Sequence, residues 1–350
     1  MYDYLIIGHG LAGAVLSHEL LNQGKKVMVF NDPSLKSASM IAGGLYNPIT
    51  GRKMVKTWNA DNVFPIIEPF YRSFQEMLST KILYDIGIYR PFLNIEEQNE
   101  WQGKAALDTY SPYVDQVYVS SRKEYNVNDT FGGIQLKQAG YVDTKTLVNS
   151  NKKWLENKGI YRELMFNEGQ IEEVENVMCL EGLRFEKVIY CNGYNDNSDW
   201  SFNWLPFSPV KGEILRLKID NKRIKSILNR GLFILPVEDQ TFRAGATYNW
   251  KEVDNVPSEK GRQEIEEKLK LLYQGKYEIT GSDAGIRPAT KDRRPFIGLH
   301  PENNKLGIFN GFGSKGVSLI PYYAKMFINH MEHGNSLDNE VNINRYFPLP

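Results

Sequence analysis

The segment YDYLIIGHGLAGAVLSHELLNQGKKVMVFND, residues 2–32, places three patterns in immediate succession. A short apolar strand, expected at Tyr4–Ile7, runs directly into the glycine-rich stretch GHGLAG at 8–13. Apolar residues then recur at helical spacing, and a second apolar strand is expected at Val27–Phe30. This order predicts a β–α–β unit that opens a Rossmann-like domain in an α/β protein.

Each glycine of this GxGxxG stretch has a physical task. Gly8 permits a tight turn, Gly10 lets a pyrophosphate approach the backbone, and Gly13 lets the helix pack against the strand. The free N–H groups at the start of the helix, around Leu11 and Ala12, favour negative charge. These residues are therefore candidate dinucleotide-binding residues, and a glycine-rich turn in another α/β fold is the alternative.

The residue that would hold a ribose is left open by the sequence. An acidic residue about 20 residues after the glycines commonly binds a ribose hydroxyl. The expected position, at the end of the second strand, is Asn31, and Asp32 follows it. Either side chain can make this contact, so both are candidates.

The bulk composition is that of an ordinary globular protein. The 350 residues suffice for two domains, with 41% hydrophobic and 24% charged residues and a net charge of zero. This balance favours neither a nucleic-acid partner nor a membrane surface. With two cysteines, Cys179 and Cys191, and no signal-peptide or membrane-helix pattern, we expect a cytoplasmic protein.

The next segment, SASMIAGGLYNPITGRKMVKTW at 37–58, is rich in small residues and lacks helix or strand periodicity. Such a segment can lie along an extended cofactor where larger side chains would collide. Its ASMIAGGLYNP portion resembles the D-amino acid oxidase-like family of FAD-dependent oxidoreductases, which includes glycine oxidase and monomeric sarcosine oxidase. The resemblance implies FAD as the cofactor, with Ser39, Ala42 and Gly43 beside it.

The resemblance continues in order along the chain and implies further FAD contacts from Ile171 and Gly193. The segments that carry it are QAGYVDTKTL (138–147), QIEEV (170–174), FEKVIYCNG (185–193), PVKGEILRL (209–217), LFILPV (232–237), FRAGATY (242–248), GIRPATKDRRPFIG (285–298) and GIFNGFGSKGVSLIP (307–321).

The resemblance also implies an interleaved domain organisation. A Rossmann-like FAD-binding domain would comprise residues 1–60, 140–205 and 285–350. An α+β substrate domain with a mixed antiparallel sheet would comprise 61–139 and 206–284. The periodicity agrees with an amphipathic helix around Ser258–Leu272 within the second part.

A second glycine run, GFGSKG at 311–316, precedes a helical pattern that reaches about Met331. In the resembled family this helix start points its positive end at the pyrimidine side of the flavin, where the reduced ring carries negative charge. The resemblance implies flavin contacts from residues of this turn, and an ordinary glycine-rich helix start is the alternative. The candidate residues are Gly313, Ser314, Lys315, Gly316 and Val317.

Covalent attachment of FAD is not expected. Some members of the resembled family attach it through a cysteine two residues before the position of Arg287, and that position is Gly285 here. The two cysteines lie in other predicted strands. We therefore expect noncovalent FAD.

Arg287 stands between an apolar residue and a proline at the end of a predicted strand. In D-amino acid oxidase and glycine oxidase an arginine of a corresponding element pairs with the substrate carboxylate, which a planar guanidinium matches with two parallel hydrogen bonds. The resemblance implies this role for Arg287. The alternative is a structural arginine that caps backbone carbonyls or pairs with Asp283 or Asp292.

Two further candidates for the catalytic site come from the same comparison of motifs. Arg243 occupies the place of a lysine that activates oxygen in sarcosine oxidase, and Tyr248 is a pocket candidate by position, as are Tyr46 and Lys53. The lysine with which sarcosine oxidase-like members bind carboxylate is replaced by Ser318. The arrangement therefore matches glycine oxidase better.

Together these features predict an FAD-dependent oxidoreductase that oxidises the C–N bond of a small amine or amino acid. The electron acceptor would be oxygen or another molecule, and no metal-ligand pattern is present. Hydride transfer needs orientation more than a general base, which agrees with the lack of a Ser-His or His-Asp pattern. The alternatives are a flavin domain acting on a modified tRNA base and a noncatalytic flavoprotein relay. The sequence carries no signal for substrate identity or oligomeric state.

Overall fold

The computed structural model describes residues 1–165, 167–194, 200–238 and 240–347. Its α-helices include the two that the glycine runs predict, at Leu11 and Gly316. The α-helices are α1 (Leu11–Asn22), α2 (Ala60–Leu78), α3 (Ile95–Lys104), α4 (Thr144–Asn157), α5 (Glu259–Leu272) and α6 (Gly316–His333), and the 3-10 turns are η1 (Ala38–Met40), η2 (Lys123–Tyr125), η3 (Glu168–Gln170) and η4 (Ile343–Tyr346).

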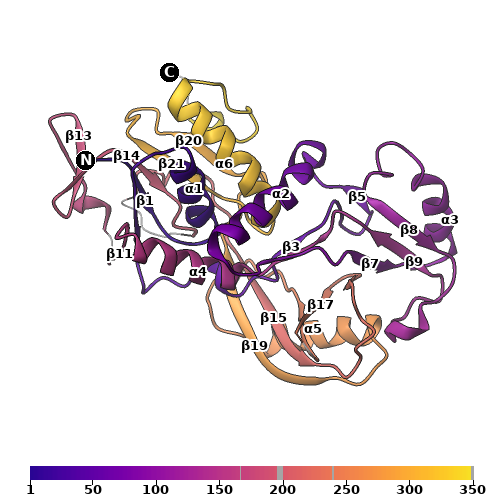
Figure 1. Cartoon of the computed structure of the whole chain (residues 1–350). Helices are drawn as coiled ribbons and strands as arrows, with labels where there is room; N and C mark the ends of the chain where they lie inside the picture. The colour runs from indigo at the N-terminus through magenta and orange to yellow at the C-terminus, as the bar shows by residue number, and fades with distance from the viewer. Residues whose placement is uncertain (166, 195–199, 239, 348–350) are drawn as a thin grey trace.

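The first sheet has a parallel centre in the order β11-β2-β1-β14, and β21 also pairs with β14 in parallel. Antiparallel strands β13, β12 and β20 extend it. This is the predicted Rossmann-like arrangement (Figure 1). Its strands are β1 (Tyr2–Ile7), β2 (Val27–Asn31), β11 (Tyr161–Glu163), β12 (Glu172–Val174), β13 (Val177–Leu180), β14 (Leu183–Tyr190), β20 (Phe296–Leu299) and β21 (Leu306–Asn310).

Strand β1 is buried on both faces, as a central strand of a parallel sheet must be. Tyr4 and Ile6 belong to the core that α1, α2, α4 and α6 share, whereas Leu5 and Ile7 face a second core on the other side of the sheet. Because successive side chains of a strand alternate between faces, one short apolar run supplies both cores. The sequence YLII therefore places β1 at the centre of this sheet.

The second sheet runs in the order β19-β15-β18-β17-β16-β7-β9-β8. It is antiparallel except between β16 and β7, so it is the mixed sheet that was predicted. Its longest strand pair, β15 with β19, carries Arg287 at the last position of β19. The strands are β7 (Ile88–Pro91), β8 (Val114–Tyr118), β9 (Gly133–Leu136), β15 (Val210–Lys218), β16 (Ile227–Asn229), β17 (Phe233–Glu238), β18 (Thr241–Gly245) and β19 (Glu278–Arg287).

Short strands connect the segments between these sheets. β10 (Gly140–Val142) pairs with both β3 (Leu45–Tyr46) and β6 (Leu83–Tyr84), and β4 (Ile49–Thr50) pairs with β5 (Val55–Lys56). β19 runs across residue 285, where the sequence predicts a domain border. It does so because it stays paired with β15 from Lys218 to Val210.

Helix α1 buries an ionisable side chain, His18. Its ring stacks on Phe74 of α2 with centroids 4.0 Å apart, and Asn22 lies 2.9 Å from Nε2. Burial lowers the pKa of His18 to about 4, because the charged ring would lose its hydration. His18 is therefore neutral in the folded protein at pH 7.

This burial predicts a pH-dependent stability. The folded pKa lies below the usual 6.5, so the unfolded chain binds the proton first as the pH falls. The stabilisation is fully present above about pH 6.5 and declines toward pH 4, with a loss of about 2 kcal/mol at pH 5. Urea unfolding of wild type and His18→Leu at pH 7 and pH 5, in the same FAD concentration, should show the larger loss in wild type. His333→Leu, which changes an exposed histidine, is the control, and equal losses in wild type and His18→Leu would contradict the prediction.

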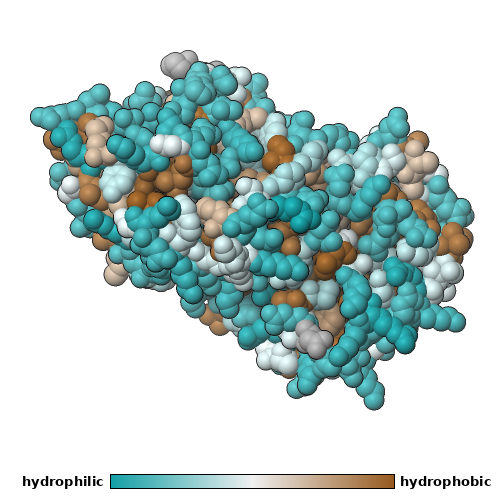
Figure 2. Space-filling view, in the orientation of Figure 1, coloured by the Kyte–Doolittle hydropathy of each residue, from teal (hydrophilic) through white to brown (hydrophobic). Residues whose placement is uncertain are grey.

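The surface is mostly polar. Figure 2 shows a face covered largely by hydrophilic residues, with hydrophobic ones in small separate groups. Within the described ranges, no helix combines the length and the apolar character that crossing a bilayer requires.

Candidate active site

A cavity of about 1810 Å³ is lined by residues of both sheets. Pockets that hold one small ligand usually occupy about 300–1,000 Å³, so this one has room for more than one molecule. The carboxyl ends of the parallel strands reach it through Ile7, Asn31 and Asn310, and Cys191 follows the end of β14. Ligands of open α/β sheets bind at this edge.

The first glycine run borders the cavity, and its backbone leaves no space for side chains. Gly8 has a φ of +97°, and a Cβ on it would lie 2.6 Å from the Cα of Asn192. A Cβ on Gly10 would approach Ser37 Oγ to 2.9 Å. A Cβ on Gly13 would lie 2.0 Å from the carbonyl oxygen of Gly8. Gly13 therefore sets the contact of helix and loop, while Gly8 and Gly10 keep the backbone bare toward the cavity.

The start of α1 is open to a ligand. No side chain caps the helix at Gly10, so N–H groups of its first turn are available to an anion. The Leu11 N–H donates to Ser39 Oγ at 3.0 Å, and Thr144 Oγ1 donates to the Ser39 carbonyl at 2.6 Å. These bonds hold the small-residue segment 37–44 beside the helix start. Bare glycine backbone, an uncapped helix and this segment fit the pyrophosphate and the extended shape of FAD.

The two ribose candidates both line the cavity but have different partners. Asn31 Oδ1 accepts the His9 N–H at 2.9 Å, which attaches it to the glycine loop. The Asp32 carboxylate accepts from the N–H and the hydroxyl of Ser34 at 2.8 and 2.6 Å. Asn31 thus shapes the loop, Asp32 shapes the turn after β2, and both stay candidates for the ribose.

His9 lies within the glycine loop without adding charge to it. Its Nε2 is 2.8 Å from Asn151 Oδ1, and burial lowers the pKa of His9 to about 4. The imidazole is therefore neutral at pH 7. The positive field at this end of the cavity comes from the helix dipole instead.

The second glycine run brings the start of α6 to the cavity. Residues 313–317 line it, and no side chain caps the helix. Lys315 adds a positive charge, although burial, and then the nearby Arg294 and Arg293, lower the pKa of its ammonium group. Helix start and lysine together favour an anionic ligand group here.

A buried asparagine joins the two loops that meet at this edge. Asn310 Nδ2 donates to the Gly193 carbonyl at 2.7 Å and to Asn192 Oδ1 at 3.3 Å. Its Oδ1 accepts the Gly311 N–H at 2.8 Å. Asn310 therefore holds the loop after β14 against the loop after β21, a role that the sequence analysis does not assign to it.

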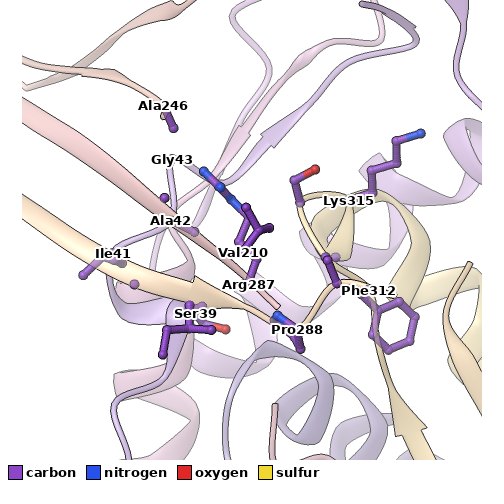
Figure 3. Close-up of a pocket in the computed structure, with 18 of the residues that line it drawn as sticks. Ser39, Ile41, Ala42, Gly43, Val210, Ala246, Arg287, Pro288, Phe312 and Lys315 are labelled. Atoms are coloured by element: carbon purple, nitrogen blue, oxygen red, sulfur yellow. The ribbon is translucent and has the colours of Figure 1, made fainter. Parts of the chain in front are cut away.

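Arg287 extends into the cavity without a carboxylate partner among the described residues. Its Nη1 donates to the Thr247 carbonyl at 3.1 Å, and its guanidinium lies 4.5 Å from the Tyr248 ring centroid. In Figure 3 it extends in a different direction from Lys315. Burial lowers the pKa of Arg287 from its usual value, while Tyr248 acts in the opposite direction. The guanidinium thus presents its remaining donors to the cavity.

The two carboxylates that could pair with Arg287, those of Asp283 and Asp292, form ion pairs with other arginines. Asp283 pairs with Arg216 at 3.3 Å, and Asp292 pairs with Arg345 at 2.9 Å. Space for the Arg287 guanidinium comes from Gly212, where a Cβ would lie 2.1 Å from Arg287 Nη2. The pairing of Arg287 with Asp283 or Asp292 is therefore wrong. Its bond to the Thr247 carbonyl fits the backbone-capping part of the structural alternative.

Most predicted site residues line this cavity, from parts of the chain that lie far apart in sequence. Lys53 and Tyr46 do not, and Arg52 lines it in place of Lys53. The predicted residues that line it are Gly8, Gly10, Leu11, Ala12, Asn31, Asp32, Ser39, Ala42, Gly43, Gly193, Tyr248, Arg287, Gly313, Ser314, Lys315, Gly316 and Val317.

Besides Lys53 and Tyr46, three further predicted residues lie outside the lining. Gly13 packs against the Gly8 carbonyl beneath the loop and so does not reach the cavity. Arg243 donates to the Ala42 carbonyl at 3.3 Å and so braces the small-residue segment. Ile171 packs against the second core, because it precedes the edge strand β12. Within the described ranges no three His, Cys, Asp or Glu side chains are arranged to hold a metal ion.

Cys191 lines the cavity, but as a buried thiol. Burial raises its pKa well above the usual value, which disfavours the nucleophilic thiolate. A side chain at Gly285 would require Ile41 to move, since a Cβ there would lie 2.4 Å from Ile41 Cδ1. The buried thiol of Cys191 and the crowding at Gly285 both support noncovalent attachment of the cofactor, which stays a prediction.

The aromatic pair Tyr248 and Trp250 marks the exposed side of the cavity. Their rings stack with centroids 6.0 Å apart, and they are 51% and 59% exposed. Nine basic and three acidic residues line the cavity, although the whole chain has no net charge. The cavity therefore favours anionic ligands.

Comparison with known proteins agrees with this geometry. The model of a family described as DAO, FAD dependent oxidoreductase, matches residues 3–329. A glycine oxidase of Bacillus licheniformis is 23% identical over 361 residues, which cover 97% of this chain and 95% of that protein. The crystal structure of glycine oxidase from Bacillus cereus superposes with a TM-score of 0.76 at 20% identity, covering 96% of each chain.

A second kind of relative is longer than this chain. The tRNA 5-methylaminomethyl-2-thiouridine biosynthesis bifunctional protein MnmC of Marinobacter nauticus is 21% identical over 347 residues. The match covers 92% of this chain and 54% of that protein, so the chain spans about half the length of this relative.

Proposed function

The chain belongs to the DAO family of FAD-dependent oxidoreductases, and on that premise we propose that it oxidises the C–N bond of a small amine that carries a carboxylate. It is an enzyme, and FAD is its cofactor. The observation that carries the finer proposal is Arg287, a partly buried guanidinium that faces the cavity and has no carboxylate partner among the described residues. A substrate carboxylate would complete its charge and its hydrogen bonds.

The residues of the chain divide the work between cofactor and substrate. The loop 8–13, Ser39 and the starts of α1 and α6 would hold FAD, which supplies a two-electron acceptor for hydride transfer when bound. Arg287 would hold the substrate carboxylate and thereby orient the neighbouring C–H bond toward the bound FAD. Loss of that hydride and of the N–H proton turns the C–N single bond into C=N. Water then adds to the carbon, and the C–N bond breaks to give an oxo acid and an amine or ammonia.

An anaerobic absorbance titration tests this proposal. Purified protein loaded with FAD would be mixed with glycine, sarcosine, proline and D-amino acids, each compared with the amine that lacks the carboxylate, such as dimethylamine for sarcosine. We expect one carboxylated amine to bleach the flavin band and its partner to leave it unchanged. Readmission of air then tests whether oxygen is the electron acceptor. Bleaching by both members of a pair would remove the carboxylate from the proposal.

A second candidate substrate is a glycine-derived side chain on a modified tRNA base. Its support is the exposed pair of Tyr248 and Trp250 beside Arg287, since stacked aromatic rings and basic residues are what an unpaired base and its phosphates require. The relative of Marinobacter nauticus is named for biosynthesis of a modified tRNA uridine. Bleaching by tRNA that carries such a side chain, with no response to the small amines, would favour this candidate.

A further inference from the structure

Two further arginines line the cavity on the substrate side, Arg90, which is buried, and Arg230, which is partly buried. Arg90 is at the end region of β7, and Arg230 lies in the turn between β16 and β17. Phe233, three residues beyond Arg230, closes against the cofactor segment, since a Cβ on Gly43 would lie 2.8 Å from its Cζ. Arg90, Arg230 and Arg287 all line this one cavity.

The hydrogen-bond partners of Arg90 leave one of its buried donors without an acceptor among the described residues. Arg90 donates to the carbonyls of Gly51 and Arg52 at 3.2 and 3.3 Å, and its side chain is 9% exposed. The Arg90 Nε–H is buried and has no hydrogen-bond partner in the described structure. Arg230 donates to the carbonyls of Phe92 and Leu271 at 3.1 and 3.3 Å.

The charge near the pair is also unbalanced. Glu97 lies 3.5 Å from Arg90 Nη2, and its other oxygen accepts the Leu93 N–H at 2.7 Å. Arg230 has no ion pair with a described carboxylate. Burial lowers the pKa of Arg230, nearby Glu97 raises it, and the positive charge of Arg90 lowers it again. Asp129 is also near, but it already accepts hydrogen bonds from Tyr89, Ser121 and the Arg122 N–H. Two guanidinium groups thus share one directly paired carboxylate.

A purely structural role explains these arginines poorly. Bracing a turn through backbone carbonyls needs only neutral N–H donors, whereas a buried charge pays for lost hydration unless an anion compensates it. An oxyanion at the pair would supply the missing acceptor and the missing charge together. Guanidinium groups suit carboxylate and phosphate oxygens alike.

We propose that Arg90 and Arg230 form a second oxyanion subsite, so that the substrate carries two acidic groups, one at Arg287 and one here. This proposal rests on the proposed function, because it assigns the first acidic group to Arg287. It narrows the substrate class to amines with a carboxylate beside the reacting carbon and a second carboxylate or phosphate farther along the molecule.

Calorimetric titration of the FAD-loaded protein tests the subsite without turnover. The probes are the dicarboxylates from malonate to suberate, each paired with the monocarboxylate of equal carbon number, and 3-phosphonopropionate compared with succinate. We expect one dicarboxylate to bind about tenfold more tightly than its monocarboxylate, or better, because a charge-assisted bidentate contact is gained. A stronger 3-phosphonopropionate titration would identify phosphate as the preferred second group.

Variants separate this subsite from the first. In Arg230→Gln, which keeps an N–H donor for the loop carbonyls, the dicarboxylate should fall to the affinity of the monocarboxylate, which itself stays unchanged. Arg223→Gln, at an exposed arginine of the same region, should keep the full difference. Arg90→Lys, whose ammonium lacks the guanidinium fork, should reduce the difference and serves as the second variant if Arg230→Gln loses FAD.

The contrary results are distinct for the two proposals. The second subsite would be overturned if no dicarboxylate binds more tightly than its monocarboxylate at any chain length. It would also be overturned if the difference in affinity is the same in Arg230→Gln as in wild type. If Arg287→Ala leaves monocarboxylate binding unchanged, the proposed function fails at its own arginine, whatever the dicarboxylates do.

Discussion

Replacement of Arg287 by alanine should lower kcat/KM for a carboxylated amine by about 30- to 700-fold, which corresponds to about 2–4 kcal/mol. The guanidinium lines the cavity, partly buried, and bonds to the Thr247 carbonyl, so its other donors are available for a substrate. Alanine removes the charge and both arms of a bidentate contact. FAD should remain bound, because Arg287 belongs to β19 and not to either glycine loop.

Steady-state kinetics on wild type, Arg287→Ala and Arg287→Lys would measure this effect. Lysine restores the charge but not the planar fork, and we expect it to recover only part of the loss. Arg216→Ala is the matched control, since Arg216 lies on the neighbouring strand β15 and pairs with Asp283 outside the cavity. A KM and kcat for Arg287→Ala equal to those of wild type would place this residue outside the substrate site.

Replacement of Gly13 by alanine should yield protein with little or no bound FAD. The new Cβ would lie 2.0 Å from the Gly8 carbonyl oxygen, which is backbone and cannot rotate away. Helix α1 must then shift away from the loop, and the free N–H groups at its start would no longer point at the pyrophosphate. We expect FAD affinity to fall on the order of 100-fold and stability by about 1–3 kcal/mol.

Flavin absorbance after gel filtration and urea unfolding of the apoprotein would measure the two effects separately. Gly103→Ala is the control, because Gly103 is a helical glycine of α3 with nothing within 4 Å of an added Cβ. That change should keep the yellow colour and leave stability equal or higher by up to about 1 kcal/mol. Normal FAD content in Gly13→Ala would show that the loop tolerates a displaced helix.

The FAD half of the site was predictable because its signals are local. The run GHGLAG lies between an apolar strand and a helix pattern, and the structure confirms β1, α1 and β2 around it. The second run, GFGSKG, likewise precedes α6. Glycines with positive φ and helix starts act over a few residues, so their spacing in sequence already describes the loop.

The substrate half was predictable only in part. The resemblance pointed to Arg287. Whether Arg287 pairs with Asp283, with Asp292 or with a ligand depends on the tertiary structure around it. Arg90 and Arg230 are 140 residues apart in the sequence and carry no common motif. Arg243, named from its motif, instead bonds to the Ala42 carbonyl.

The sequence by itself determined the Rossmann-like strand–helix–strand start, the dinucleotide loop and the two helix starts, because backbone geometry and apolar periodicity are properties of short segments. Only the tertiary structure decided which charges remain without partners. Whether Arg287, Arg90 or Arg230 finds a carboxylate depends on β15 pairing with β19 and on β7 pairing with β16. These pairings join segments far apart in the chain, and side-chain charge is neutralised by neighbours in space.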